Sequence, residues 1–157
     1  KNRLAIPVRR VYCRSMAECP NDFITGGNEM METEPTVVIA AYGTLRSGES
    51  NAHFCRNAIS RRRAEIPGTL YDTGRGYPAY VPEGETPVVV ELIEISLSDW
   101  AGVERLEGYP RLYDRTLLEF TLEDGSTVQA WIYIMNRLPR FSRIIPSGDW
   151  KEYSIQA

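Results

Sequence analysis

The chain has 157 residues, 43% of them hydrophobic, which is enough to bury one core of ordinary size. Its formal net charge of −3 gives no general reason to expect nucleic acid as a partner. No apolar stretch approaches the roughly 20 residues that span a bilayer, so no membrane association is expected. Oligomeric state stays open at this point.

The chain contains three cysteines, Cys13, Cys19 and Cys55, and one histidine, His53. An odd number of cysteines in a chain of this size fits reduced thiols, so we expect a cytoplasmic protein. A zinc site needs about four ligands at close spacing, which these scattered residues do not supply. His53 and Cys55 are two positions apart, and on a helix such side chains point in different directions, so they are not predicted to form a catalytic pair.

Residues 1–35 differ in character from the rest of the chain. They hold five basic and five acidic residues and a turn-rich stretch, and Met30 and Met31 stand just before the domain-like part. We interpret them either as an extension of the main domain or as a fragment of a longer polypeptide, with a domain over 36–157. Both alternatives remain open from the sequence.

An unbroken apolar run from Val37 to Tyr42 predicts a strand buried on both faces. Gly43 ends this run, and glycine there allows the backbone to turn tightly and to approach a ligand closely. The N–H groups that follow, from Thr44 and Leu45, can converge on an anion. An ordinary junction between a strand and a loop is the alternative.

The next stretch, Glu49–Ser60, is predicted to be a short helix with Ser47 or Ser50 as its cap. The basic cluster Arg61–Arg63 is interpreted as the solvated end of that helix rather than as a nucleic-acid site.

Three further segments predict strands. Ala64–Tyr71 is interrupted by Pro67-Gly68, and Tyr77–Val81 has prolines at positions 78 and 82, which favour an edge position. Pro87–Ile95 alternates between two faces that are both mostly apolar, so it is expected to be buried.

Ser96 followed by Asp99 resembles a capping box and predicts a helix that ends at Gly108 in a left-handed turn. Glu107 therefore falls at the C-terminal end of this helix, where the helix dipole disfavours an anion. Burial would raise the pKa of its carboxyl group further, and such a group can exchange protons near neutral pH. A solvent-facing glutamate at a frayed helix end is the alternative.

Two alternating runs, Leu117–Leu122 and Thr127–Met135, flank Asp124-Gly125 and predict a β-hairpin. The tail through Pro146–Trp150 is predicted to be a loop that places Trp150 against the body. Because strands outnumber helices and mostly follow one another directly, the fold class expected is α+β, with an antiparallel or mixed sheet curled into a partly closed barrel with short helices.

Together these segments resemble the gamma-glutamylcyclotransferase-like family. The resemblance covers residues 37 to about 151 and rests on Tyr42-Gly43-Thr44-Leu45-Arg46, Gly76-Tyr77-Pro78-Ala79, Leu106-Glu107-Gly108-Tyr109-Pro110 with Tyr113 and Arg115, and Ala130-Trp131-Ile132-Tyr133. Members often have aspartate three residues before the catalytic glutamate, where this chain has Glu104.

The resemblance implies a cavity and an intramolecular reaction, in which the α-amine of a γ-glutamyl group attacks its own side-chain carbonyl and 5-oxoproline forms. Glu107 would carry the proton, the turn Tyr42, Gly43, Thr44 and Leu45 would hold the γ-glutamyl end, and Tyr113 would hydrogen-bond in the cavity. The partner implied is a small γ-glutamyl amine or amino acid, with no metal or organic cofactor. A non-catalytic binding module or an interaction domain of a larger protein are the alternatives.

Overall fold

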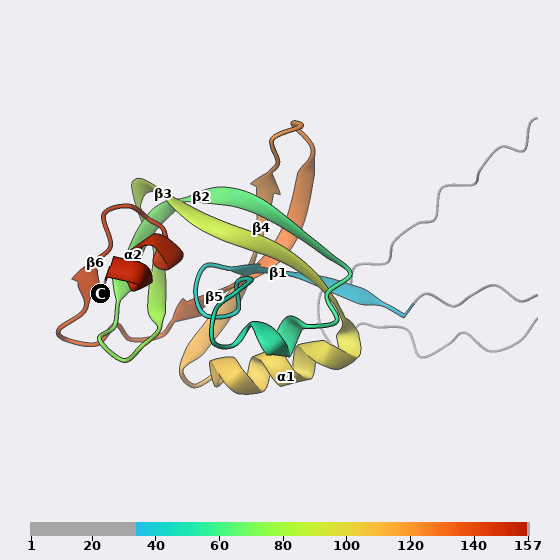
Figure 1. Ribbon diagram of the computed structural model, residues 1–157, viewed down its shortest axis with the longest axis horizontal. Coiled ribbons are helices and arrows are strands. Elements are labelled where there is room, and N and C mark those ends of the chain that lie inside the picture. The colour runs from blue at the N-terminus through green and yellow to red at the C-terminus, as the bar shows by residue number, and fades with distance from the viewer. Residues whose placement is uncertain (1–33, 157) are drawn as a thin grey trace, which may run out of the picture.

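The computed structural model describes residues 34–156, so the expectations for residues 1–33, Cys13 and Cys19 included, lie outside the described part. The elements in chain order are β1 (Thr36–Ala41), the 3-10 turn η1 (Ala52–Cys55), β2 (Ser60–Asp72), β3 (Pro78–Ser96), α1 (Leu97–Glu107), β4 (Tyr113–Thr121), β5 (Thr127–Met135), β6 (Arg143–Ile144) and α2 (Trp150–Gln156) (Figure 1). None of the helices in residues 34–156 is long and apolar enough to cross a membrane.

Strand β1 lies inside a six-stranded sheet whose order is β4-β5-β1-β3-β2-β6. It runs antiparallel to β3, from the pair Thr36 and Ser96 to the pair Ala41 and Glu91, and parallel to β5. Residues 37 to 42 are all buried, which explains why the run carries no charge on either face. The prediction of a buried inner strand is confirmed.

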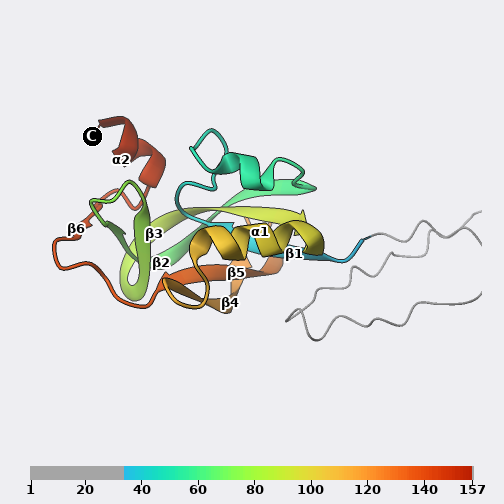
Figure 2. The same cartoon turned by 90° about the horizontal axis from the view of Figure 1, so that it is seen from below.

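The two faces of β1 belong to two separate apolar clusters. Val38 packs in a cluster that also contains Leu70 of β2 and Phe120 of β4. Because β2 and β4 lie on opposite flanks of the sheet, the sheet must curl for them to meet. The other face packs against α1 through Trp100 and Val103, and Figure 2 shows α1 along one side of the sheet. The α+β class with a curled, barrel-like sheet is confirmed.

Helix α1 begins and ends as its sequence signals predict. The Ser96 hydroxyl accepts a hydrogen bond from the Asp99 N–H at 3.2 Å, and Gly108 ends the helix with φ = 63°. The predicted hairpin forms from β4 and β5, with β4 beginning earlier than expected, at Tyr113.

The predicted helix over Glu49–Ser60 is wrong. Only η1 forms, as a 3-10 turn, and Ser60 already begins β2 opposite Glu94. The Ile59 N–H donates to the Glu94 carbonyl at 2.7 Å, so the end of the segment pairs with β3 and does not continue as a helix. Ile59 is 55% exposed and contributes no buried helix face. The cluster Arg61–Arg63 consequently lies in a strand, not at a helix end.

Two other boundaries differ from expectation. The segments expected as two strands, Tyr77–Val81 and Pro87–Ile95, belong to the single strand β3, which pairs with β2 across a register shift between Gly68 and Thr69. The tail is not only a loop, because α2 begins at Trp150, whose ring is buried against the body as predicted.

Candidate active site

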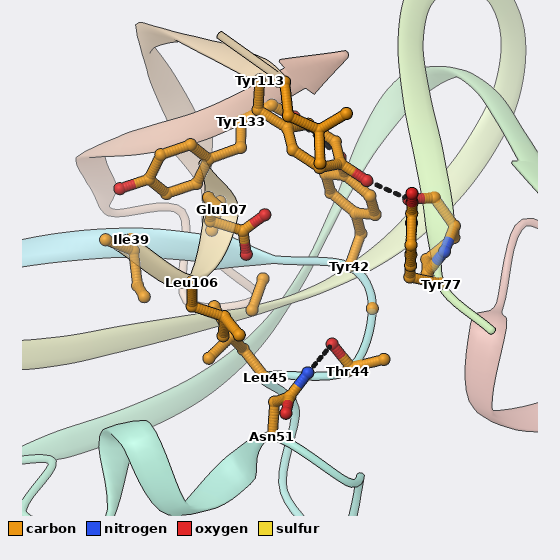
Figure 3. Close-up of a pocket in the computed structure, with 15 residues that line it drawn as sticks. Ile39, Tyr42, Thr44, Leu45, Asn51, Tyr77, Leu106, Glu107, Tyr113 and Tyr133 are labelled. Atoms are coloured by element: carbon orange, nitrogen blue, oxygen red, sulfur yellow. Dashed lines mark hydrogen bonds between the residues drawn. The ribbon is translucent and has the colours of Figure 1, made fainter. Parts of the chain in front are cut away.

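A cavity of about 250 Å³ opens where β1 ends, beside the end of α1 and the start of β4. All six site residues expected from the sequence line it: Tyr42, Gly43, Thr44, Leu45, Glu107 and Tyr113 (Figure 3). The cavity is also lined by residues that sequence reasoning did not assign to the site, namely Ile39, Ala40, Ala41, Asn51, Tyr77, Pro78, Leu106, Leu112 and Tyr133.

The turn after β1 is held by hydrogen bonds that do not use the N–H groups of Thr44 and Leu45. The Arg46 N–H donates to the Gly43 carbonyl at 3.1 Å, and Asn51 donates to Thr44 through both its backbone N–H and its side-chain amide. Within residues 34–156, the N–H groups of Thr44 and Leu45 donate to no acceptor. Both residues line the cavity.

Glycine is required at position 43 because the backbone there lies very close to the Pro78 ring. A β-carbon at this position would lie 2.6 Å from Cγ and 2.8 Å from Cδ of Pro78. The proline ring is rigid and forms part of the cavity wall. Any larger residue at 43 would therefore displace either the turn or the wall.

Three tyrosines surround the deep part of the cavity. The Tyr42 hydroxyl donates to the Tyr133 carbonyl and the Tyr113 hydroxyl to the Pro78 carbonyl, each at 2.8 Å. The Tyr133 hydroxyl accepts from the Trp100 indole N–H at 3.1 Å. Burial is the main cause that raises the pKa of each tyrosine, and the charge of Glu107 adds a smaller increase in all three, so all three stay protonated. The alternation of β5 could have placed Tyr133 on the α1 side of the sheet, but not beside Glu107.

Glu107 is the last residue of α1 and, among residues 34–156, the only charged residue that lines this cavity. Figure 3 shows its carboxyl group directed into the space between Tyr133 and Tyr42. Burial raises the pKa of this carboxyl group to about 7. The sequence indicated a raised pKa from both the helix end and burial, and burial is the cause that acts in the structure.

A comparison with known protein families covers the residues that form this cavity. A family model described as gamma-glutamyl cyclotransferase, AIG2-like, matches residues 39–152. The chain belongs to this family. The match spans the cavity, the sheet and the tail, as the resemblance of the motifs predicted.

Individual relatives of this cyclotransferase-family chain agree with that assignment. It is 36% identical over 126 residues to gamma-L-glutamyl-butirosin B gamma-glutamyl cyclotransferase from Niallia circulans, covering 73% of this chain and 76% of that protein. The solution structure of ytfP from Escherichia coli has a TM-score of 0.58 and 30% identity, covering 75% and 99% of the two chains. An AIG2-like protein from Mus musculus has a TM-score of 0.61 and 23% identity, covering 73% and 88%, and supports the fold.

Glu107 ends a helix whose last turns are anchored by neighbouring side chains. Glu104, one turn before Glu107, forms an ion pair with Arg115 of β4. The Arg115 guanidinium lies 4.2 Å from the ring centre of Trp100 and 4.5 Å from that of Tyr109. The Trp100 indole N–H in turn donates a hydrogen bond to the Tyr133 hydroxyl. Glu104, the departure from the family pattern, is thus neutralised within this cluster.

The raised pKa of Glu107 predicts a specific pH dependence of stability. The folded protein disfavours the ionised carboxyl group between its ordinary value of 4.5 and about 7, so stability falls as pH rises through that window. Glu107→Gln removes this penalty. The free energy of unfolding of the variant, minus that of the parent, should therefore increase by about 1–3 kcal/mol from pH 4.5 to pH 8. Urea unfolding at both pH values measures it, and a difference independent of pH would contradict the burial of an ionisable Glu107.

Proposed function

We propose that this protein releases 5-oxoproline from a γ-glutamyl amine or γ-glutamyl amino acid, with Glu107 as the acid and base. One observation carries the proposal: a carboxyl group with a pKa of about 7 lies in a cavity that has no other charged lining residue in the described part of the chain. Such a group is partly ionised and partly protonated near neutral pH, so it can both accept and return a proton.

The substrate's α-carboxylate would be held at the turn after β1. The N–H groups of Thr44 and Leu45 have no acceptor in residues 34–156 and line the cavity, and paired backbone donors suit a carboxylate. The γ-glutamyl chain would then fold back so that its amine faces its own γ-carbonyl. Because the two reacting groups belong to one molecule, holding this conformation supplies much of the rate enhancement.

One carboxyl group, that of Glu107, can carry out all the proton transfers of this reaction. Glu107 takes a proton from the α-ammonium, and the amine nitrogen attacks the γ-carbonyl carbon and forms the ring. The protonated Glu107 gives this proton to the leaving nitrogen and takes a second proton from the ring nitrogen, which still carries two hydrogens after the attack. The old C–N bond then breaks as the carbonyl re-forms, 5-oxoproline and the amine are released, and Glu107 passes the second proton to the free amine and becomes a carboxylate again. Of the three buried tyrosines, Tyr133 alone has a hydroxyl proton with no acceptor among residues 34–156, so it suits the oxygen that becomes negative.

The leaving amine is left open by this arrangement. The relative from Niallia circulans is named for gamma-L-glutamyl-butirosin B, which suggests a bulky amine as one class to test here. Alkyl amines, polyamines, lysine and α-amino acids are the other classes.

A screen of γ-glutamyl amides and dipeptides for 5-oxoproline release tests the proposal. We expect at least one class to give release that depends on enzyme concentration and stops with Glu107→Gln. Binding of γ-glutamyl compounds without release, measured by calorimetry, would favour a non-catalytic binding module. Absence of both binding and release across the screen would contradict the proposed substrate class.

A further inference from the structure

The turn after β1 is tied to the C-terminal tail of the chain. The Arg46 guanidinium donates to the Asp149 carboxylate at 2.6 Å, across 103 positions of sequence. The Lys151 ammonium donates to the Ser47 carbonyl at 2.7 Å. Figure 1 and Figure 2 both show α2 next to the loop that follows β1. The turn that lines the cavity on one side is therefore attached, on its other side, to the start of α2.

The contact between Arg46 and Asp149 is an ion pair of limited exposure. The two side chains are 10% and 23% exposed, whereas those of the surface pair Arg63 and Glu65 are 59% and 45% exposed. A pair with little exposure is weakly screened, and removing one partner leaves the other charge poorly compensated. Burial alone would raise the pKa of the Asp149 carboxyl group, but the hydrogen bond and the charge of Arg46 hold it below its ordinary value. The pair is therefore charged at neutral pH.

Asp149 belongs to a part of the tail that is docked on the sheet. The carbonyl of Gly148, the residue before it, accepts a hydrogen bond from the Val89 N–H of β3 at 2.9 Å. The ring of Trp150, the residue after it, is buried in the core. The Asp149 carboxylate also accepts from the Lys151 N–H at 2.9 Å and so caps α2. Asp149 is thus a fixed point against which the Arg46 side chain is held.

Arg46 connects the backbone of the turn to this fixed point. Its N–H donates to the Gly43 carbonyl at 3.1 Å and closes the turn, and its side chain reaches Asp149. Ser47, the next residue, is held separately by the Glu91 carboxylate of β3. A displaced Arg46 would consequently move the turn itself, together with the two N–H groups that directly precede it.

We propose that Arg46 and Asp149 are positioning residues: their ion pair keeps the turn in the conformation in which the Thr44 and Leu45 N–H groups meet the substrate's α-carboxylate. This inference rests on the proposed function of the turn. Neither Arg46 nor Asp149 lines the cavity, so neither contacts a ligand held there. Glu107 is carried by a different element, α1, so the pair should affect KM and leave kcat nearly unchanged.

Arg46→Met tests the proposal, because methionine keeps an unbranched apolar chain and removes the guanidinium group. Asp149 keeps its hydrogen bond to the Lys151 N–H in this variant, so α2 keeps its cap. With a substrate from the screen, KM should rise at least about tenfold, the loss expected when hydrogen bonds to a charged group are weakened, while kcat changes by less than about twofold. Asp149→Asn should act in the same direction. The double variant Arg46→Met/Asp149→Asn should raise KM no further than the larger single effect, because both remove one interaction.

Glu152→Gln is the matched control for these variants. It removes one negative charge from the same first turn of α2, at an exposed position that does not line the cavity. It should keep the parent's KM and kcat. A control that raised KM as much as Asp149→Asn does would show that the charge of the tail matters and not the pair, and would overturn the proposal.

A second measurement needs no substrate. Backbone amide relaxation, measured by NMR, should show the order parameters of Thr44 and Leu45 falling from about 0.85 in the parent toward the flexible range below about 0.6 in Arg46→Met. Glu152→Gln should match the parent. If Arg46→Met lost the parent's circular dichroism spectrum, Asp149→Asn would decide, because asparagine also caps a helix.

The two measurements separate a failure of this inference from a failure of the proposed function. Unchanged order parameters and amide chemical shifts of the turn, or a parent-like KM in both single variants, would overturn the inference. A fall in kcat at constant KM would overturn it as well. A mobile turn in Arg46→Met, in a protein that neither binds nor converts any γ-glutamyl compound, would support the role of the ion pair and contradict the carboxylate site alone.

Discussion

Glu107→Gln should lower kcat by about 10²- to 10⁴-fold, the range that a proton-transferring side chain typically contributes. Glutamine keeps the shape and polarity of the side chain but can neither accept nor return the proton. The cavity wall and the N–H groups of Thr44 and Leu45 are unchanged, so KM should stay within a few-fold of the parent. Steady-state release of 5-oxoproline from a substrate found in the screen measures both quantities.

Glu104→Gln is the matched control for this prediction. It makes the same chemical change one turn earlier on α1, at a residue that pairs with Arg115 and does not line the cavity. It should lower stability, because Arg115 loses its carboxylate partner, and should affect kcat far less than Glu107→Gln does. A Glu107→Gln enzyme that turns over the substrate at nearly the parent rate would show that another group moves the proton.

Local sequence signals predicted the elements whose boundaries are set locally. The uncharged run Val37–Tyr42 had to be buried on both faces, and the structure places it inside the sheet. Ser96 and Gly108 predicted both ends of α1, because caps act on the adjacent backbone. Asp124-Gly125 likewise predicted the β4–β5 hairpin.

Expectations failed where a distant partner decides the structure. The helix expected over Glu49–Ser60 does not form at its C-terminal end, because Ser60 pairs with Glu94 of β3. No local sequence pattern predicts that pairing. The short helix α2 was missed because Pro146 and Gly148 precede it and suggested a loop throughout. In both cases tertiary contacts override the local helix propensity: a helix that the sequence favours does not form, and one that it disfavours does.

The residues of the active site differ in how far the sequence could reveal them. Glu107 and Gly43 carry signals of their own, a carboxyl group at a helix end and a glycine at a strand end. That Tyr133 lies beside Glu107 depends on the register of β4 and β5 and on the packing of α1. Only the structure could therefore show it.

Gly43→Ala should lower kcat/KM about ten- to a hundredfold, which corresponds to about 1–3 kcal/mol of strain from overpacking. The new methyl carbon would lie 2.6 Å from Cγ of Pro78, and neither the proline ring nor the turn can give way without changing the cavity. Moving the turn displaces the N–H groups of Thr44 and Leu45 that are proposed to hold the α-carboxylate. The loss should therefore appear mainly as a higher KM, and Gly43→Val should show it more strongly.

Gly102→Ala adds the same methyl group at a place that can accept it. Its β-carbon would lie 3.8 Å from Cδ1 of Phe54, an ordinary contact, and the position is inside α1. Alanine is favoured over glycine in a helix interior by about 1 kcal/mol, so this control should be more stable than the parent and equally active. Thermal unfolding of both variants separates a folding defect from a binding defect. If Gly43→Ala kept the parent KM and thermal stability, the turn would tolerate a side chain, and its close contact with Pro78 would not constrain substrate binding.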